Sequence, residues 1–318
     1  MGPAFFFGGQ GMKAKTSIGL AIALVLSFVA STSAQVVREQ KDRDLVPDGK
    51  GGGHDQGQGS GAVKAAKPVR ANGINYHGGP LILGTTRTYI IWYGSWPTGT
   101  DTARDILTDL ASGIGGTPYF NINTTYYDGG GTHVTNAVSY AGSTDNNYSL
   151  GKNLTDGNIQ SIVASAINGG SLPKDTNAVY FVVTSADVNE TSGFCTQYCG
   201  WHTHGTIGGS DIKYAFIGDP TRCPSSCEEQ TTGPNGSTGA DGMASIISHE
   251  LEEAVTDPDL NAWYDNRGEE NADKCAWTFG TEYTTSNGAT ANMSFGGRDW
   301  LIQRNWVNAS GGFCAKSF

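Results

Sequence analysis

The sequence predicts a single mixed α/β domain of the α+β class over residues 75–318, with a central mixed sheet, a motif-bearing helix and disulfide-stabilised loops. Three observations predict this class. Runs of β-branched and aromatic residues have the length of buried strands. Segments with apolar residues at helical spacing lie between them, and six cysteines fall in the second half of the chain. Strands that alternate with helices are typical of layered α/β arrangements.

Strands are expected where β-branched and aromatic residues follow one another without interruption. Residues 87–94 and 177–184 have the composition of strands buried on both faces, and residues 212–217 form a shorter run. The tail over residues 295–318 is also expected to be rich in strands.

Helices are expected at three places. The first follows Thr100 and Asp101, which can cap its N-terminus, and the second covers residues 155–168. The third covers residues 239–256 and presents an apolar stripe that consists of Met243, Ile246, Ile247, Leu251, Ala254 and Val255.

The N-terminal region has the composition of a targeting segment followed by a linker. Two lysines precede an apolar run and a small-residue site, so residues 1–34 are predicted to be a secretory signal peptide. Residues 35–74 are rich in Gly, Gln and charged residues and are predicted to be a disordered linker. A secreted protein is therefore expected.

Cysteine count and charge limit the classes of partner. An even number of cysteines after a signal peptide indicates disulfides rather than thiolate metal ligands. We expect neighbours to pair locally, which gives Cys195 with Cys199, Cys223 with Cys227, and Cys275 with Cys314. The formal net charge of −10 argues against nucleic acid or an anionic membrane as partner. A monomer is expected.

The segment His249-Glu250-Leu251-Glu252-Glu253 is the strongest indication of chemistry. In zincin peptidases, H-E-x-x-H places two imidazoles one helical turn apart on Zn²⁺, and the Glu is the general base for a metal-bound water. Here Glu253 stands at the second histidine position, so His249 and Glu253 still share one helix face. Glu250 stays at the position of the catalytic base. A zincin-like character of the domain is expected on this ground.

Further metal ligands are expected downstream of this helix. Glu270 and Asp273 resemble the segment that supplies a third ligand in gluzincins, but their spacing is one residue shorter, so either could be the ligand and the other its support. Asp257 is a metzincin-like alternative with the wrong spacing, and it is expected instead to end the helix before Pro258.

Other residues are expected at most to line the site. His202 is a candidate from a loop between cysteines, and Tyr264 could contribute an aromatic wall. One imidazole with two carboxylates is a harder ligand set than that of a zincin, so Ca²⁺ or Mn²⁺ competes with Zn²⁺ on ligand type. Zn²⁺ is nevertheless expected, because the imidazole of His249 is a poor Ca²⁺ ligand and Glu250 keeps the position of the base. An acidic network without a metal would explain the same residues structurally.

Several separate blocks of the sequence form a recognisable pattern. They include Tyr76-His77-Gly78-Gly79-Pro80-Leu81, Phe194-Cys195-x-x-x-Cys199-Gly200-x-His202, Cys223-Pro224-x-x-Cys227 and Gly297-Arg298-x-Trp300-Leu301. In this order the blocks resemble the phosphate-induced protein 1 family, also called EXORDIUM-like. The resemblance implies a secreted, extracellular or cell-wall-associated protein, linked in plants to growth and brassinosteroid response. It implies no established catalytic activity.

The helix motif and the resemblance lead to two hypotheses. The first is a secreted metal-dependent hydrolase, a zinc metallopeptidase that uses a metal-bound water, Glu250 as base and a peptide or cell-wall polymer as substrate. The second is a non-catalytic extracellular or cell-wall-associated binding module with a structural ion.

Overall fold

The computed structural model describes residues 1–2, 42–45, 73–99 and 102–318. The predicted signal peptide lies outside the described residues except for its first two. Most of the predicted linker lies outside them as well, but its residues Asp42–Leu45 form strand β1. No helix among the described residues is long and apolar enough to cross a membrane.

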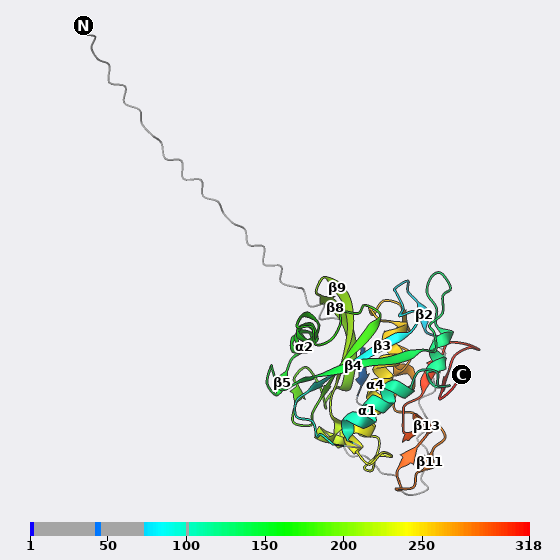
Figure 1. Ribbon diagram of the computed structural model, residues 1–318. Coiled ribbons are helices and arrows are strands. Elements are labelled where there is room, and N and C mark those ends of the chain that lie inside the picture. The colour runs from blue at the N-terminus through cyan, green and yellow to red at the C-terminus, as the bar shows by residue number, and fades with distance from the viewer. Residues whose placement is uncertain (3–41, 46–72, 100–101) are drawn as a thin grey trace. The chain divides into compact units, whose positions relative to one another are not determined.

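A six-stranded mixed sheet forms the centre of the fold, as predicted (Figure 1). The strand order is β1-β8-β9-β6-β3-β4. Its strands are β1 (Asp42–Leu45), β3 (Thr86–Tyr93), β4 (Val138–Asn146), β6 (Ala178–Thr184), β8 (Tyr198–Ile207) and β9 (Ser210–Ile217). Strands β4, β3, β6 and β9 are mutually parallel, whereas β8 is antiparallel to β9 and β1 is antiparallel to β8. The expected buried strands β3 and β6 are confirmed, because every residue of β6 is buried.

Three strands of this sheet were not predicted, and the first of them, β1, lies in the segment that was expected to be a disordered linker. Strand β4 alternates between half-buried and exposed residues, so it has no apolar run. Strand β8 was expected to be a loop, and this expectation is wrong. Its ten residues include polar Thr203 and His204 and two glycines, which interrupt the apolar pattern that would indicate a strand.

Helices cover both faces of the sheet. The main ones are α1 (Ala103–Gly113), α2 (Asp156–Asn168) and α4 (Thr238–Thr256). Each lies where the sequence predicts it, although α1 is capped by Thr102 rather than by Thr100 or Asp101, which lie outside the described residues. Helices α1 and α4 contact each other (Figure 1).

The pleat of β8 shows that α2 and α4 lie on opposite faces. A Cβ on Gly200 would meet Ile246 of α4, and one on Gly205 would meet Gln160 of α2. Because side chains of even and odd residues point to opposite faces of a strand, His202 faces α4, as Gly200 does. The sheet is therefore the middle of three layers.

Helix α4 is buried along nearly its whole length, including its polar residues. Ser237 caps it by accepting a hydrogen bond from the Ala240 N–H at 3.3 Å. Asp257 ends it, as expected, because its Oδ1 accepts hydrogen bonds from the N–H groups of Asn261 and Ala262 at 2.6 Å each.

Short elements complete the described fold, and the expected strand-rich tail is confirmed as separate two-stranded ladders. The strands are β2 (Asn75–Tyr76), β5 (Asn153–Leu154), β7 (Asn189–Glu190), β10 (Trp263–Tyr264), β11 (Tyr283–Thr284), β12 (Thr290–Ala291), β13 (Met293–Phe295), β14 (Arg298–Trp300), β15 (Asn305–Val307) and β16 (Phe313–Ala315). The short helices are η2 (Phe120–Thr125), η3 (Pro220–Arg222), α3 (Pro224–Cys227) and η4 (Asp273–Cys275).

All six cysteines form disulfides, but two of the expected pairs are wrong. Cys195 bonds to Cys223 and Cys199 bonds to Cys227, with Cα–Cα distances of 5.6 and 5.5 Å. The reason is that α3 places Cys223 and Cys227 one helical turn apart beside residues 195–199. Each cysteine therefore bonds across to the other segment. The predicted pair Cys275–Cys314 is confirmed.

Candidate metal centre

Helix α4 brings the two motif residues together as the spacing predicts. His249 Nε2 lies 3.0 Å from Glu253 Oε1, and both side chains are fully buried. Glu250, on the same helix, is also fully buried. The His-Glu-x-x-Glu segment is therefore an internal feature of the fold and not an acidic surface.

The segment that contains Glu270 and Asp273 returns to this helix face. The Asp273 N–H donates a hydrogen bond to Glu253 Oε1 at 3.0 Å, and Asp273 Oδ1 lies 3.7 Å from His249 Nε2. The disulfide of Cys275 ties the adjacent helix η4 to β16. Both candidate downstream ligands are thus held near the motif.

Strand β8 adds His202 to these residues. Its Nε2 lies 3.5 Å from Glu270 Oε2 and 3.8 Å from Glu253 Oε2. Neither ring nitrogen of His202 has a hydrogen-bond partner among the described residues. His202 was expected at most to line the site, but the structure places it as close to Glu253 as a ligand would be.

Glu253 therefore stands at the centre of two overlapping groups. One consists of His202, Glu253 and Glu270, the other of His249, Glu253 and Asp273, and the potential ligand atoms within each lie within 4.8 Å of one another. These five residues are called the Glu253 cluster below. They come from a strand, a helix and a loop that are far apart in the sequence.

Burial shifts the pKa of two residues of the cluster. Desolvation, with smaller contributions from His249 and His204, lowers the pKa of His202 to about 3, so its imidazole is neutral. Desolvation and the nearby Asp273 carboxylate raise the pKa of Glu253 to about 7, although His249 opposes this rise. A neutral imidazole is the metal-binding form of histidine. A raised carboxyl pKa indicates that a positive charge would be stabilising there. The donor set therefore fits a divalent cation.

Glu252, the remaining glutamate of the motif, has a different environment. Glu252 accepts a hydrogen bond from Asn305 Nδ2, and burial raises its pKa well above the usual range. It is therefore an internal residue on another side of α4, outside the Glu253 cluster.

Tyr264, which was expected to line the site, instead stacks on His77, with ring centroids 3.7 Å apart. Asp257 caps the end of α4, and burial raises its pKa to about 6, although a side-chain hydrogen bond with Glu270 opposes this rise. Asp257 therefore also lies beside the Glu253 cluster. His204 belongs to a separate group with Asp211 and Asp259. There Lys213 Nζ lies 2.6 Å from Asp211 and 3.5 Å from Asp259, and thus supplies a cation.

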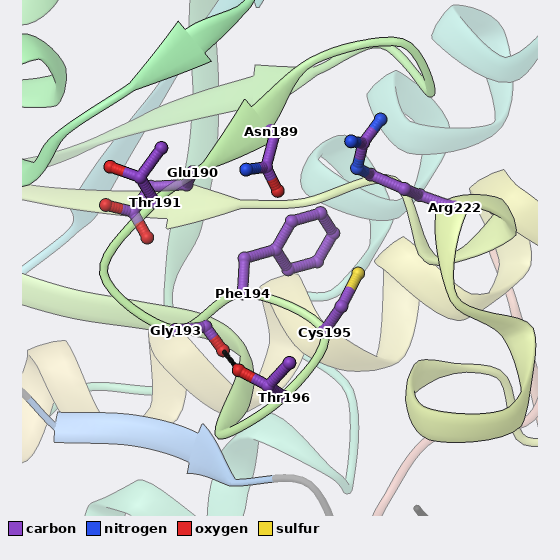
Figure 2. A pocket seen from close by; sticks show the side chains of 8 residues that line it. All are labelled: Asn189, Glu190, Thr191, Gly193, Phe194, Cys195, Thr196 and Arg222. Atoms are coloured by element: carbon purple, nitrogen blue, oxygen red, sulfur yellow. Dashed lines mark hydrogen bonds between the residues drawn. The ribbon is translucent and has the colours of Figure 1, made fainter.

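Figure 2 shows a pocket of about 650 Å³ elsewhere on the protein. Phe194 and the disulfide-bonded Cys195 line it, with Arg222 on one side and Glu190 on another. The residues that line it include none of the Glu253 cluster. The cluster is thus a buried centre and not the floor of this pocket.

Gly200 allows β8 to approach Glu250 closely. A Cβ at this position would lie 2.5 Å from Ile246 Cγ2, 3.0 Å from the Phe216 carbonyl oxygen and 3.1 Å from Glu250 Oε1. The glycine thus places the backbone of β8 directly against the motif helix.

We expect Gly200→Ala to lower the free energy of unfolding by about 1–3 kcal/mol, because the added methyl group overpacks buried atoms. Gly205→Ala is the matched control on the same strand, since its Cβ would meet only the far end of the Gln160 side chain closely. Urea denaturation of both variants checks this. Equal losses would show that the β8–α4 contact is not specially tight.

These features define a disulfide-bonded α+β protein with a buried cluster of histidines and carboxylates. Residues 74–297 match the family model described as "Phosphate-induced protein 1 conserved region". The chain belongs to this family, which confirms the expected resemblance.

Curated plant proteins are similar over most of the chain. Protein EXORDIUM-like 5 of Arabidopsis thaliana is 33% identical over 73% of this chain and 75% of its own length. Protein EXORDIUM-like 3 of the same plant is 32% identical over 73% of this chain and 80% of its own length. Protein PHOSPHATE-INDUCED 1 of Nicotiana tabacum is 29% identical over 63% of this chain and 69% of its own length. No solved structure matches.

Proposed function

We propose that this protein is a secreted, zinc-dependent hydrolase of zincin-like character that acts on peptides. One observation carries the proposal: two histidines and three carboxylates from distant parts of the sequence converge in a buried cluster around Glu253. Buried carboxylates near one another are destabilising unless a cation is bound among them. The two imidazoles favour Zn²⁺ over Ca²⁺. The three disulfides are consistent with secretion.

Each residue of the cluster has a definable role. Glu253 would hold the ion together with His249 and Asp273, or together with His202 and Glu270. The remaining histidine and carboxylate would then orient the ligands. A bound zinc ion would supply Lewis-acid polarisation of a carbonyl group or of water. Glu250, next to His249 and against β8, would accept the proton from the attacking water.

The direct test is cleavage of casein by the purified mature chain. We expect slow hydrolysis that is lost on chelation and restored by added Zn²⁺ but not by Ca²⁺. The proportion of zinc bound per chain is measured in the same samples. A protein that is fully loaded with zinc and cleaves neither casein nor a peptide library would contradict the proposal.

Burial of all the cluster residues except Asp273, which is partly exposed, favours a second candidate function, a non-catalytic extracellular binding module with a structural ion. His202 and Glu253 have no exposed side-chain surface. In this case the ion would stabilise the fold and no substrate would be cleaved.

We expect chelation to lower the melting temperature under both hypotheses. An ion present at about 1,000 times its dissociation constant contributes roughly 4 kcal/mol. For a domain of this size, that corresponds to a decrease of roughly 10 °C. Differential scanning calorimetry with and without chelator checks this. An unchanged melting temperature would contradict both metal hypotheses.

We expect two substitutions to change the pH dependence of the metal-free protein in opposite directions. The pKa of Glu253 is raised from its ordinary value of 4.5 to about 7. Protonation of Glu253 therefore stabilises the folded state as the pH falls from 7 to 4.5. The pKa of His202 is lowered to about 3, so protonation of the unfolded chain destabilises the protein as the pH falls from 6.5.

Between pH 6.5 and 4.5 the two effects oppose each other. Relative to the parent, Glu253→Gln should therefore lose stability on acidification, whereas His202→Gln should gain it. Urea denaturation at several pH values measures both differences. If the stability of both variants relative to the parent changed in the same direction with pH, the environments assigned to these two residues would be wrong.

A further inference from the structure

We propose that the edge of β8 opposite β9 is a docking surface for an extended peptide, and that the chain's own strand β1 occupies it and blocks the Glu253 cluster. The inference rests on the proposed function for its consequence, which is that β1 keeps hydrolysis slow. The docking itself can be tested without any hydrolysis.

The register of β1 places it beside the candidate centre. Asp42 pairs with His202, Arg43 with Trp201 and Asp44 with Gly200, and the register shifts before Leu45. Strand β9 pairs with β8 on its other side. Without β1, β8 would therefore be an edge strand with unpaired backbone groups at His202 and its neighbours.

Strand β1 also contacts the other two elements that build the centre. It packs near α4, which carries His249, Glu250 and Glu253, and near η4, which begins at Asp273. A four-residue segment thus lies along all three elements that supply the cluster. A chain that pairs with β8 in this position has its backbone next to the residues that would act on it.

The position of Glu250 supports a peptide as the ligand. Gly200 brings the β8 backbone close to the Glu250 carboxylate. A strand that pairs with β8 at Gly200 and His202 would run past this carboxylate and past the imidazole of His202. Pairing through backbone hydrogen bonds selects an extended polypeptide, largely irrespective of its side chains.

Burial of the cluster requires that something moves before a substrate can reach it. His202, Glu250 and Glu253 are all completely buried. Strand β1 is a four-residue edge element, and residues 46–72 separate it from β2 along the chain. A short strand paired along one edge contributes little stability by itself. Cleavage of the chain after β1 would make its release independent of the rest of the fold.

The test uses the full mature chain with a specific protease site introduced between residues 46 and 72, folded and loaded with Zn²⁺. The probe is a fluorescent peptide with the sequence of residues 38–48. We expect the uncleaved chain not to bind the probe and the cleaved, dialysed chain to bind it. Before cleavage, we expect β1 to be detached from β8 in fewer than about one molecule in ten. Cleavage should therefore raise casein hydrolysis about tenfold or more.

The outcomes separate the two proposals. Binding of the probe after cleavage without any hydrolysis would support the docking surface and overturn the proposed hydrolase. Equal probe binding and equal hydrolysis before and after cleavage would overturn the docking surface, whatever the activity. Inhibition of the cleaved enzyme by unlabelled peptide 38–48 would support both.

A pair of proline substitutions in the uncleaved chain tests the pairing itself. On an edge strand, successive N–H groups point alternately toward the neighbouring strand and toward solvent. Proline is tolerated only at the solvent-facing positions. Of Arg43→Pro and Asp44→Pro, one should therefore reproduce the effect of cleavage on probe binding and the other should behave like the parent. Identical behaviour of the two variants would overturn the assigned pairing.

Discussion

Glu250→Gln is expected to reduce hydrolysis by roughly 10²–10⁴-fold while zinc binding stays close to that of the parent. The substitution removes the proton acceptor and keeps the shape of the side chain. Glu250 is not one of the residues that converge on Glu253. Steady-state cleavage of a peptide substrate and zinc analysis of the same preparation measure the two quantities.

Glu252→Gln is the matched control for this substitution. Glu252 is equally buried on the same helix, but its pKa is raised well above the usual range and it accepts a hydrogen bond from Asn305. An uncharged glutamine can keep that hydrogen bond. We therefore expect little change in activity. If the two variants lost activity equally, the effect would come from packing and not from the base.

His249→Ala is expected to reduce zinc occupancy to less than about a tenth at a limiting zinc concentration, because loss of a direct ligand costs more than the 10–100-fold typical of supporting residues. His133→Ala is the control. His133 is exposed, and its ring nitrogen is 2.6 Å from the Thr124 carbonyl oxygen. Equilibrium dialysis against zinc gives both occupancies, and full occupancy in His249→Ala would show that the ligands are misassigned.

The same assay separates the roles of the two downstream carboxylates. Glu270 lies against His202 and Asp273 against His249. We compare Glu270→Gln and Asp273→Asn with His249→Ala. If the changed carboxylate is a direct ligand, its variant should bind zinc as weakly as His249→Ala does. A supporting residue should lose only 10–100-fold in affinity, as an approximate range.

Local patterns were sufficient for the long elements of the fold. Strands β3 and β6 are rich in β-branched and aromatic residues, and α4 follows from its apolar stripe and from Pro258 after its end. The sequence therefore predicted which residues are buried in these elements and where the motif helix ends. It showed the relation between His249 and Glu253 for the same reason, since a helix fixes residues four apart.

The contribution of β8 could not be recognised from apolar periodicity. Its face toward α4 carries Gly200, His202 and His204, which resemble a loop when they are taken singly. A signal was present nonetheless. Gly208 and Gly209, both with positive φ, form the two-residue connection between β8 and β9, and such a glycine pair between two strand-like runs is typical of a hairpin. That hairpin would have placed His202 in the sheet.

Tertiary contacts decide what remains. Nothing local distinguishes Glu252 from Glu253, because both follow His249 within one turn. Asn305 and Asp273, both distant in sequence, provide their different environments. The crossed disulfides are a similar case, because two C-x-x-x-C segments with equal spacing give no indication of which cysteine lies opposite which.

The crossed disulfides also influence how the chain can be oxidised. Cys195–Cys223 and Cys199–Cys227 join the same two segments, each across 28 residues. Formation of either bond brings the other two thiols together at a high effective concentration. The second bond should therefore form soon after the first, and a local bond within either C-x-x-x-C segment would use a thiol that both crossed bonds need. During maturation, a disulfide isomerase would be required mainly to undo such local bonds.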